Sequence, residues 1–261
     1  MANEKQYGVP ELGPVTVAIL RQALRLGWRD FLATPGYGIF FAAIYVGLGW
    51  LFAWITIASG QSYWLLFAAI SFPMIGPFAA TGLYEISHRR QNGETFRPFD
   101  ILGVVFQQGN RQLPWLCVMI VVVFLFWFTV AHMIFALFLG LSTMTNISNG
   151  YEVYLTQQGL MMLGFGSLVG AAVSLLIYML TVLSLPMLLD REVDFITAMI
   201  TSFKFVRAQF ALMFAWGCLI AALTLLSLVP WFLGLLIVLP WLGHTSWHLY
   251  AILNQDIKKG A

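Results

Sequence analysis

The histidines in or beside the apolar stretches of this 261-residue sequence are the side chains best suited to chemistry. His244 and His248 are four residues apart, so they share one face of a helix. Glu85 and His88 are three residues apart at the end of another apolar stretch. Imidazole and carboxylate groups can relay protons, contact a lipid headgroup or bind a divalent ion. We expect one polar cluster, comprising Tyr84, Glu85, His88, His244, His248 and Tyr250. The plainer alternative is a set of polar helix ends that reach water or one another.

His132 is isolated from that cluster. It lies 19 residues after Leu113, which is roughly 28 Å along a helix at about 1.5 Å per residue. By the same rise it differs from His244 in depth by about 15 Å, so one haem does not fit between the two. We expect His132 to bond to a carbonyl or a headgroup near the outer face, with a haem or metal ligand as the alternative. The sequence therefore predicts no metal and no cofactor.

The composition identifies the environment that must position these residues. Hydrophobic residues make up 60% of the chain and charged residues 9%, whereas a soluble domain has about 25% charged residues. So few charges do not cover a soluble surface, which excludes a soluble globule, a disordered chain and a nucleic-acid binder. Nucleotide-binding loops, nucleophile elbows and zinc-ligand spacings are absent from the sequence. We expect a membrane protein that is not an enzyme.

A helix needs about 20 apolar residues to cross a bilayer. The chain offers six such runs, so we predict an all-α integral membrane protein with six transmembrane helices. A polar segment (1–15), one transmembrane domain (16–254) and a short tail (255–261) make up the chain. The predicted spans are 35–57, 63–86, 113–139, 160–189, 210–229 and 231–253.

The basic residues indicate the orientation. All 13 Lys and Arg residues fall before span one, between spans two and three, between spans four and five, or after span six. The other loops contain none. The positive-inside rule then places both termini in the cytoplasm. We expect a multi-pass protein of the bacterial inner membrane.

Each odd-numbered span follows a short amphipathic segment: 23–31, 100–108 and 194–204. In the first and directly before it, Arg21, Arg25 and Arg29 line the face beside the apolar one. Such a helix lies in the membrane interface with its apolar side down and its arginines on lipid headgroups. Each even-numbered span carries a proline in its cytoplasmic half, where a bend is expected. We therefore predict three parallel repeats, each an interfacial helix followed by a helical hairpin.

Three stretches carry a resemblance to a known family. They are GWRDF at 27–31 with PG at 35–36, GPFAATGLYEISHRR at 76–90, and LPWLGHTSWHLY at 239–250. The chain resembles, over about residues 16–254, a bacterial family of integral membrane proteins of unknown function, often labelled cytochrome c oxidase subunit I. The label implies a link to respiratory membranes. A haem–copper catalytic subunit needs more histidines and more spans than this chain has, so the resemblance implies at most an accessory role.

Three functions remain open on these grounds. The first is a non-catalytic accessory or assembly subunit of a larger membrane complex of respiratory or photosynthetic electron transport, with lipids and other integral membrane subunits as partners. The second is a small transporter or channel, which would account for the prolines in the even-numbered spans. The third is a haem- or quinone-binding redox protein. The bulky apolar spans and the short loops favour the first.

Overall fold

The computed structural model describes residues 7–60, 64–140 and 152–254, and the regular elements of these residues are all helices. In chain order they are α1 (Val17–Ala33), α2 (Pro35–Ser59), α3 (Trp64–Gln91), α4 (Pro98–Gly109), α5 (Leu113–Leu139), α7 (Glu152–Leu155), α8 (Gln157–Thr181), α9 (Ser184–Asp190), α10 (Phe195–Ala208), α11 (Phe210–Leu228) and α12 (Leu235–Leu253).

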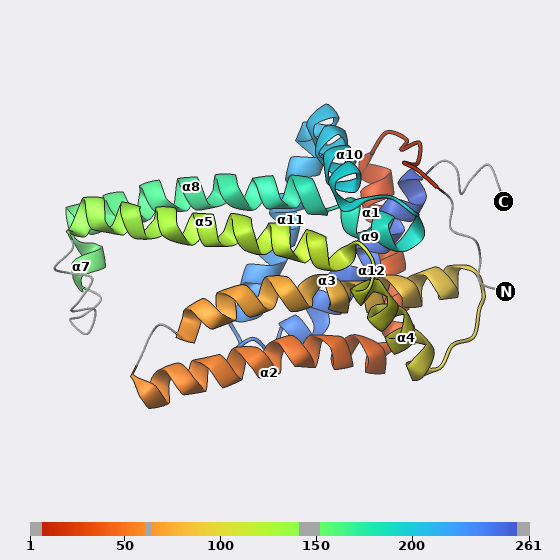
Figure 1. Ribbon diagram of the computed structural model, residues 1–261, viewed down its shortest axis with the longest axis horizontal. Helices are drawn as coiled ribbons and strands as arrows, with labels where there is room; N and C mark the ends of the chain where they lie inside the picture. Colours follow the sequence, from red (N-terminus) through yellow and green to blue (C-terminus); the bar gives the residue numbers. More distant parts are fainter. Residues whose placement is uncertain (1–6, 61–63, 141–151, 255–261) are drawn as a thin grey trace.

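The helices divide between one crowded end and a set of long helices that lead away from it. Figure 1 shows α1, α4, α9 and α10 gathered at one end, with α2, α3, α5 and α8 running lengthwise from there. The segment before α1 joins this end, because the Gly13 amide donates to the Leu253 carbonyl at 2.8 Å. The larger hydrophobic core also lies at this end, around α9, α10 and α12.

The predicted spans correspond closely to the long helices. The span at 113–139 is α5, with the same bounds, and the span at 35–57 is α2 with two further residues. Four helical segments, within 35–59, 113–139, 157–190 and 210–228, are long and apolar enough to cross a membrane. The chain is therefore a membrane protein with several apolar helices. The two other predicted spans form α3, which ends in a charged turn, and α12.

The fourth predicted span, 160–189, is not one continuous helix. It forms α8 and α9, with a break at Val182 and Leu183. The cause is Pro186, whose ring clashes with the carbonyl four residues earlier, at Val182, and which has no N–H to donate to it. The expected proline bend is thus a break at this proline, whereas α3 and α12 run on through Pro73, Pro77 and Pro240.

The turn between the last two spans is longer than predicted. The predicted spans 210–229 and 231–253 leave only Pro230 between them, but α12 begins only at Leu235. Trp231 and Phe232 take the left-handed conformation, with φ of 51° and 67°, which L-residues with large side chains rarely adopt. The Trp50 indole donates to the Trp231 carbonyl at 2.9 Å. This contact and the tight approach of Gly234 to Ser227 hold the turn in place.

All three predicted amphipathic segments form separate helices, and hydrogen bonds cap their N-terminal ends. The Thr16 hydroxyl accepts from the Ile19 amide at 3.2 Å at the start of α1. The Asp194 carboxylate accepts from the Thr197 amide at 2.8 Å at the start of α10. The hydrogen bonds that Asp194 accepts from the side chain and the amide of Thr197 hold the pKa of this carboxyl below its usual value. α4 begins with Pro98 in its first turn, and the Arg97 amide donates to Asp100 at 2.7 Å.

The prediction that the apolar side of α1 lies on lipid is wrong. Ala23, Gly27 and Phe31 are buried, and this face packs along α12. The Trp241 indole donates to the Leu24 carbonyl at 3.1 Å across the contact. Helical periodicity shows that a face will be covered but does not show what covers it, and here a protein helix takes the place expected for the membrane.

Gly27 sets how closely α1 and α12 approach. A Cβ at this position would lie 2.6 Å from the Thr245 amide nitrogen and 2.8 Å from its Cα. Both atoms are backbone, so neither can move without shifting α12. Eleven of the 19 residues of α12 are buried, so the helix cannot shift freely.

We expect Gly27→Ala to lower the free energy of unfolding by about 1–3 kcal/mol, the usual cost of overpacking. The measurement is thermal unfolding of the purified protein in mild detergent, followed by tryptophan fluorescence. Gly47→Ala is the matched control, because a Cβ there meets nothing within 4 Å. An equal midpoint for the two variants would contradict the close contact.

Candidate functional site

A buried carboxylate on α1 is the centre of a polar cluster in the crowded end. Asp30 is 1% exposed. It lies on the same face of α1 as Gly27 and Phe31, the face that packs on α12. An isolated charge at such a place is costly to bury, so it needs partners of opposite charge.

Asp30 has these partners on two other helices. The Arg90 Nε atom, at the end of α3, donates to Oδ1 at 3.0 Å. The His248 Nε2 atom, on α12, donates to Oδ2 at 2.6 Å. One carboxylate therefore joins α1, α3 and α12, and we call Asp30, Arg90 and His248 the Asp30 triad.

Burial alone raises the pKa of Asp30. The hydrogen bonds from His248 and Arg90, the positive charge on His248 and a hydrogen bond from Ser87 outweigh burial and bring the pKa to about 2. The carboxylate is therefore ionised throughout the physiological range. The triad thus acts first as a fixed link between three helices.

His244 lies one helical turn before His248 and is 0% exposed. Its Nδ1 atom lies 2.8 Å from the Ser87 hydroxyl oxygen, from α3. Its Nε2 atom is buried and has no hydrogen-bond partner among the described residues. A ring nitrogen in this state can accept a proton or bind a small polar group. His244 is accordingly the member of the predicted cluster that has a buried ring nitrogen without a hydrogen-bond partner among the described residues.

The other predicted cluster residues belong to neighbouring contacts. Glu85 accepts from Arg89 at 2.5 Å and lies 3.8 Å from His88, which forms a charged rim at the end of α3. The Tyr84 ring is buried beside Trp247. These residues thus lie along the contact between α3 and α12.

Tyr250 belongs to a further network around Asp190, at the end of α9. Its hydroxyl donates to the Asp190 carboxylate at 2.7 Å, and the Asn254 side chain donates to the same oxygen at 3.3 Å. The six predicted cluster residues are thus spread over several adjacent contact networks. In the described parts of the chain, no three His, Cys, Asp or Glu side chains come close enough to hold a metal ion.

His132 and the arginines of α1 lie outside this region. His132 is exposed on α5, and its Nδ1 atom donates to the Phe128 carbonyl at 2.7 Å. Arg21, Arg25 and Arg29 are exposed along α1, away from the face that packs on α12. They are free to contact headgroups, as the sequence suggests.

The sequence reasoning missed Asp30, although the signal was present. Asp30 stands seven residues after Ala23 and three after Gly27, which are buried positions on the same helical face. A carboxylate at this spacing is an acidic group on a face otherwise made of small and apolar residues. It therefore needs a cationic partner, and the sequence offers Arg90 and His248.

Replacing Asp30 tests the triad. Asp30→Asn keeps the size of the side chain but leaves Arg90 and His248 without their counter-charge. We expect a loss of about 3 kcal/mol, as for a broken buried ion pair, read as a lower unfolding midpoint in detergent. Glu94→Gln, at an exposed position, is the control. If both variants unfold at the wild-type temperature, the triad does not stabilise the fold.

The lowered pKa of Asp30 also predicts a dependence on pH. A carboxyl group with a folded pKa of about 2, against a usual 3.8, stabilises the fold above about pH 4. This contribution is lost as the pH falls from about 4 to about 2. We expect the unfolding midpoint to fall less steeply over this range in Asp30→Asn than in the wild type. Parallel curves would show that Asp30 titrates normally.

Comparison with known proteins agrees with a membrane protein. Residues 65–190, just under half of the chain, match a family described as "Predicted integral membrane protein (DUF2189)". The matched part runs from the first turn of α3 to the end of α9 and therefore includes two of the long apolar segments. No curated protein and no solved structure matches the chain. The family description names no activity and no substrate. The match and the apolar helices together show that this chain is an integral membrane protein with several apolar helices.

Proposed function

We propose that this chain is a non-catalytic accessory or assembly subunit of a larger membrane complex in the bacterial inner membrane. It crosses the membrane six times, through α2, α3, α5, α8, α11 and α12, and both termini are cytoplasmic. The family resemblance suggests respiratory or photosynthetic electron transport as the type of complex. The chain carries no cofactor of its own.

The positions of the charges support this orientation. All the Lys and Arg residues in the described segments belong to α1, the end of α3, the α4 region, or the segment from α9 to α10. These elements gather at the crowded end in Figure 1. The turn at 229–234 and the described residues 152–159 carry no Lys or Arg. A basic end opposite an end whose described residues include no Lys or Arg is the pattern expected for a cytoplasmic and an outer face.

The observation that carries the proposal is the hairpin of α5 and α8. Its two helices pack on each other, with Gly170 against the Trp127 ring, and they extend far from the crowded end (Figure 1). Large apolar side chains are exposed along it, among them Phe126 at 68%, Leu137 at 80% and Leu168 at 72%. Few contacts within the chain therefore hold the outer part of this hairpin.

One face of α8 is suited to a partner helix. Leu160, Gly164 and Leu168 follow each other at four-residue spacing, so they lie on one face. All three are exposed, and a Cβ at Gly164 would meet nothing within 4 Å. In a bilayer, helices associate by close packing, which small residues permit, because lipid already satisfies the apolar surface. A glycine between two exposed leucines leaves a notch for a second backbone.

The test is a mild-detergent pull-down of the tagged full chain from its native membrane, with mass spectrometry of the recovered proteins. We expect stoichiometric subunits of one membrane complex. Gly164→Leu fills the notch and should reduce their recovery about tenfold, the effect of losing about 1.4 kcal/mol of packing. Gly47→Leu is the control, since Gly47 is equally exposed and equally open but lies on α2.

Recovery of the chain alone, in several detergents, would overturn the accessory role. A cavity of about 230 Å³ between α2, α3, α11 and α12 would then favour a transporter. Equal recovery of partners with Gly164→Leu and with Gly47→Leu would keep the complex but remove this face of α8 as its contact.

A further inference from the structure

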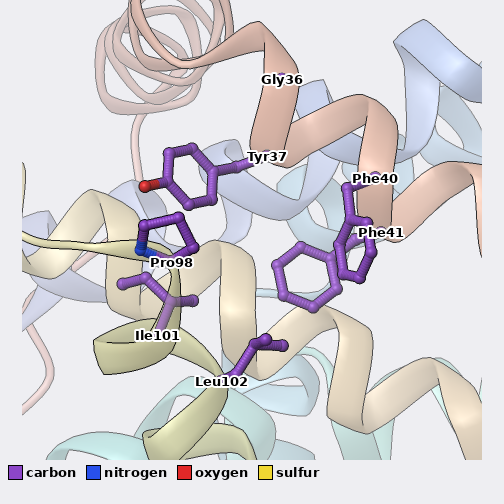
Figure 2. Close-up of a pocket in the computed structure, with 7 residues that line it drawn as sticks. All are labelled: Gly36, Tyr37, Phe40, Phe41, Pro98, Ile101 and Leu102. Atoms are coloured by element: carbon purple, nitrogen blue, oxygen red, sulfur yellow. The ribbon is translucent and has the colours of Figure 1, made fainter.

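An open groove lies between the start of α2 and the start of α4. Its volume is about 390 Å³. Figure 2 shows side chains of both helices around it, with Tyr37 and Phe41 from α2 and Ile101 and Leu102 from α4 turned toward the space between them. Such a volume is within the usual range for small-molecule sites, about 300–1,000 Å³.

The lining of the groove is almost wholly apolar. It comprises aromatic and aliphatic side chains, one proline and one glycine. A Cβ at Gly36 would meet nothing within 4 Å, so the space beside this residue is open. A hydrocarbon chain fits such a lining, whereas a charged or strongly hydrated molecule does not.

A basic residue adjoins the groove lining in the chain. Arg97 directly precedes the lining residue Pro98, and it is exposed. The nearby Asp100 carboxylate is engaged by the Arg97 main-chain amide at 2.7 Å. The Arg97 guanidinium forms no ion pair with any described residue. It can therefore bind an anion that arrives from outside the protein.

α4 also shows where the groove lies relative to the membrane. Phe99 and Phe106 are seven residues apart, so they project from one side of the helix, and they are 85% and 75% exposed. An amphipathic helix with such side chains lies in the interface, with the aromatic rings at the boundary of the acyl chains. The groove thus opens at the depth where headgroup and acyl chain meet.

We propose that this groove binds one acyl chain of an anionic phospholipid from the cytoplasmic leaflet, with the lipid phosphate on Arg97. The ligand class follows from the apolar lining, the adjacent cation and the interfacial depth. This site requires only that the chain lies in a membrane and does not depend on the accessory role.

The two parts of the site contribute differently. An acyl chain in a bilayer is already among apolar neighbours, so moving it into the groove yields little hydrophobic free energy. The groove therefore sets where the chain lies, and the charge on Arg97 sets which headgroup is retained. One Arg near an anionic lipid favours binding about fivefold, and salt weakens this preference.

The experiment measures lipids bound to the purified full chain by native mass spectrometry. Phosphatidylglycerol and phosphatidylcholine with identical acyl chains are the probes. We expect the wild type to retain phosphatidylglycerol about fivefold better. Arg97→Gln should lose this preference but still bind lipid. Gly36→Leu fills the groove and should lose most of the bound lipid, whereas Gly47→Leu, on the same helix but outside the groove, should not.

Phe40→Trp, which enlarges a half-exposed lining side chain, is a second filling variant in case Gly36→Leu does not fold. Equal lipid retention by the filling variants and by Gly47→Leu would overturn the groove as the site. An unchanged preference for phosphatidylglycerol in Arg97→Gln would overturn the role of the cation. Retention of a free fatty acid in place of phosphatidylglycerol would overturn the phospholipid as the ligand.

Discussion

The need to neutralise one buried carboxylate constrains the whole crowded end of this protein. Asp30 is on an amphipathic helix, yet it is almost fully covered. It is tolerated there only because Arg90 and His248 reach it from α3 and α12. These two residues fix both the rotation of α1 and its position along α12. Gly27, one turn earlier, then permits the close approach that this position requires.

This arrangement separates the molecule into a firmly connected end and a loosely connected one. At the crowded end, the Asp30 triad, the Asp190 network and the larger core hold α1, α3, α9, α10 and α12 to one another. Away from the crowded end, α5 and α8 pack mainly against each other. Surface that is not needed within the chain is available for lipid or for other subunits. An accessory role agrees with this division, because an accessory subunit needs a stable anchor and an exposed helical surface that its partners can contact.

The long helices and the three short amphipathic helices follow from the periodicity and the apolar runs of the sequence, because the bilayer imposes simple rules. A run such as 113–139 must be helical, since its backbone has no other hydrogen-bond partners in lipid. The covering of α1 could not be predicted in the same way. Its periodicity marks an apolar face, but α12 and a membrane satisfy that face equally well. The Asp30 triad joins residues 60 and 218 positions apart, and no local pattern relates them.

The polar residues indicate which partner covers an exposed apolar surface of this protein. In a soluble protein an exposed Phe or Leu suggests a binding site, but in a bilayer it is satisfied by lipid. Exposed apolar area therefore does not distinguish a lipid contact from a protein contact in this chain. A charge does, because it needs water, a headgroup or a partner charge. Next to the α2–α4 groove, Arg97 directly precedes the lining residue Pro98, and this adjacent cation favours a lipid anion. The exposed face of α8 carries no charge from Leu160 to Leu168, so its selectivity must come from shape, and the notch at Gly164 is the feature that supplies it.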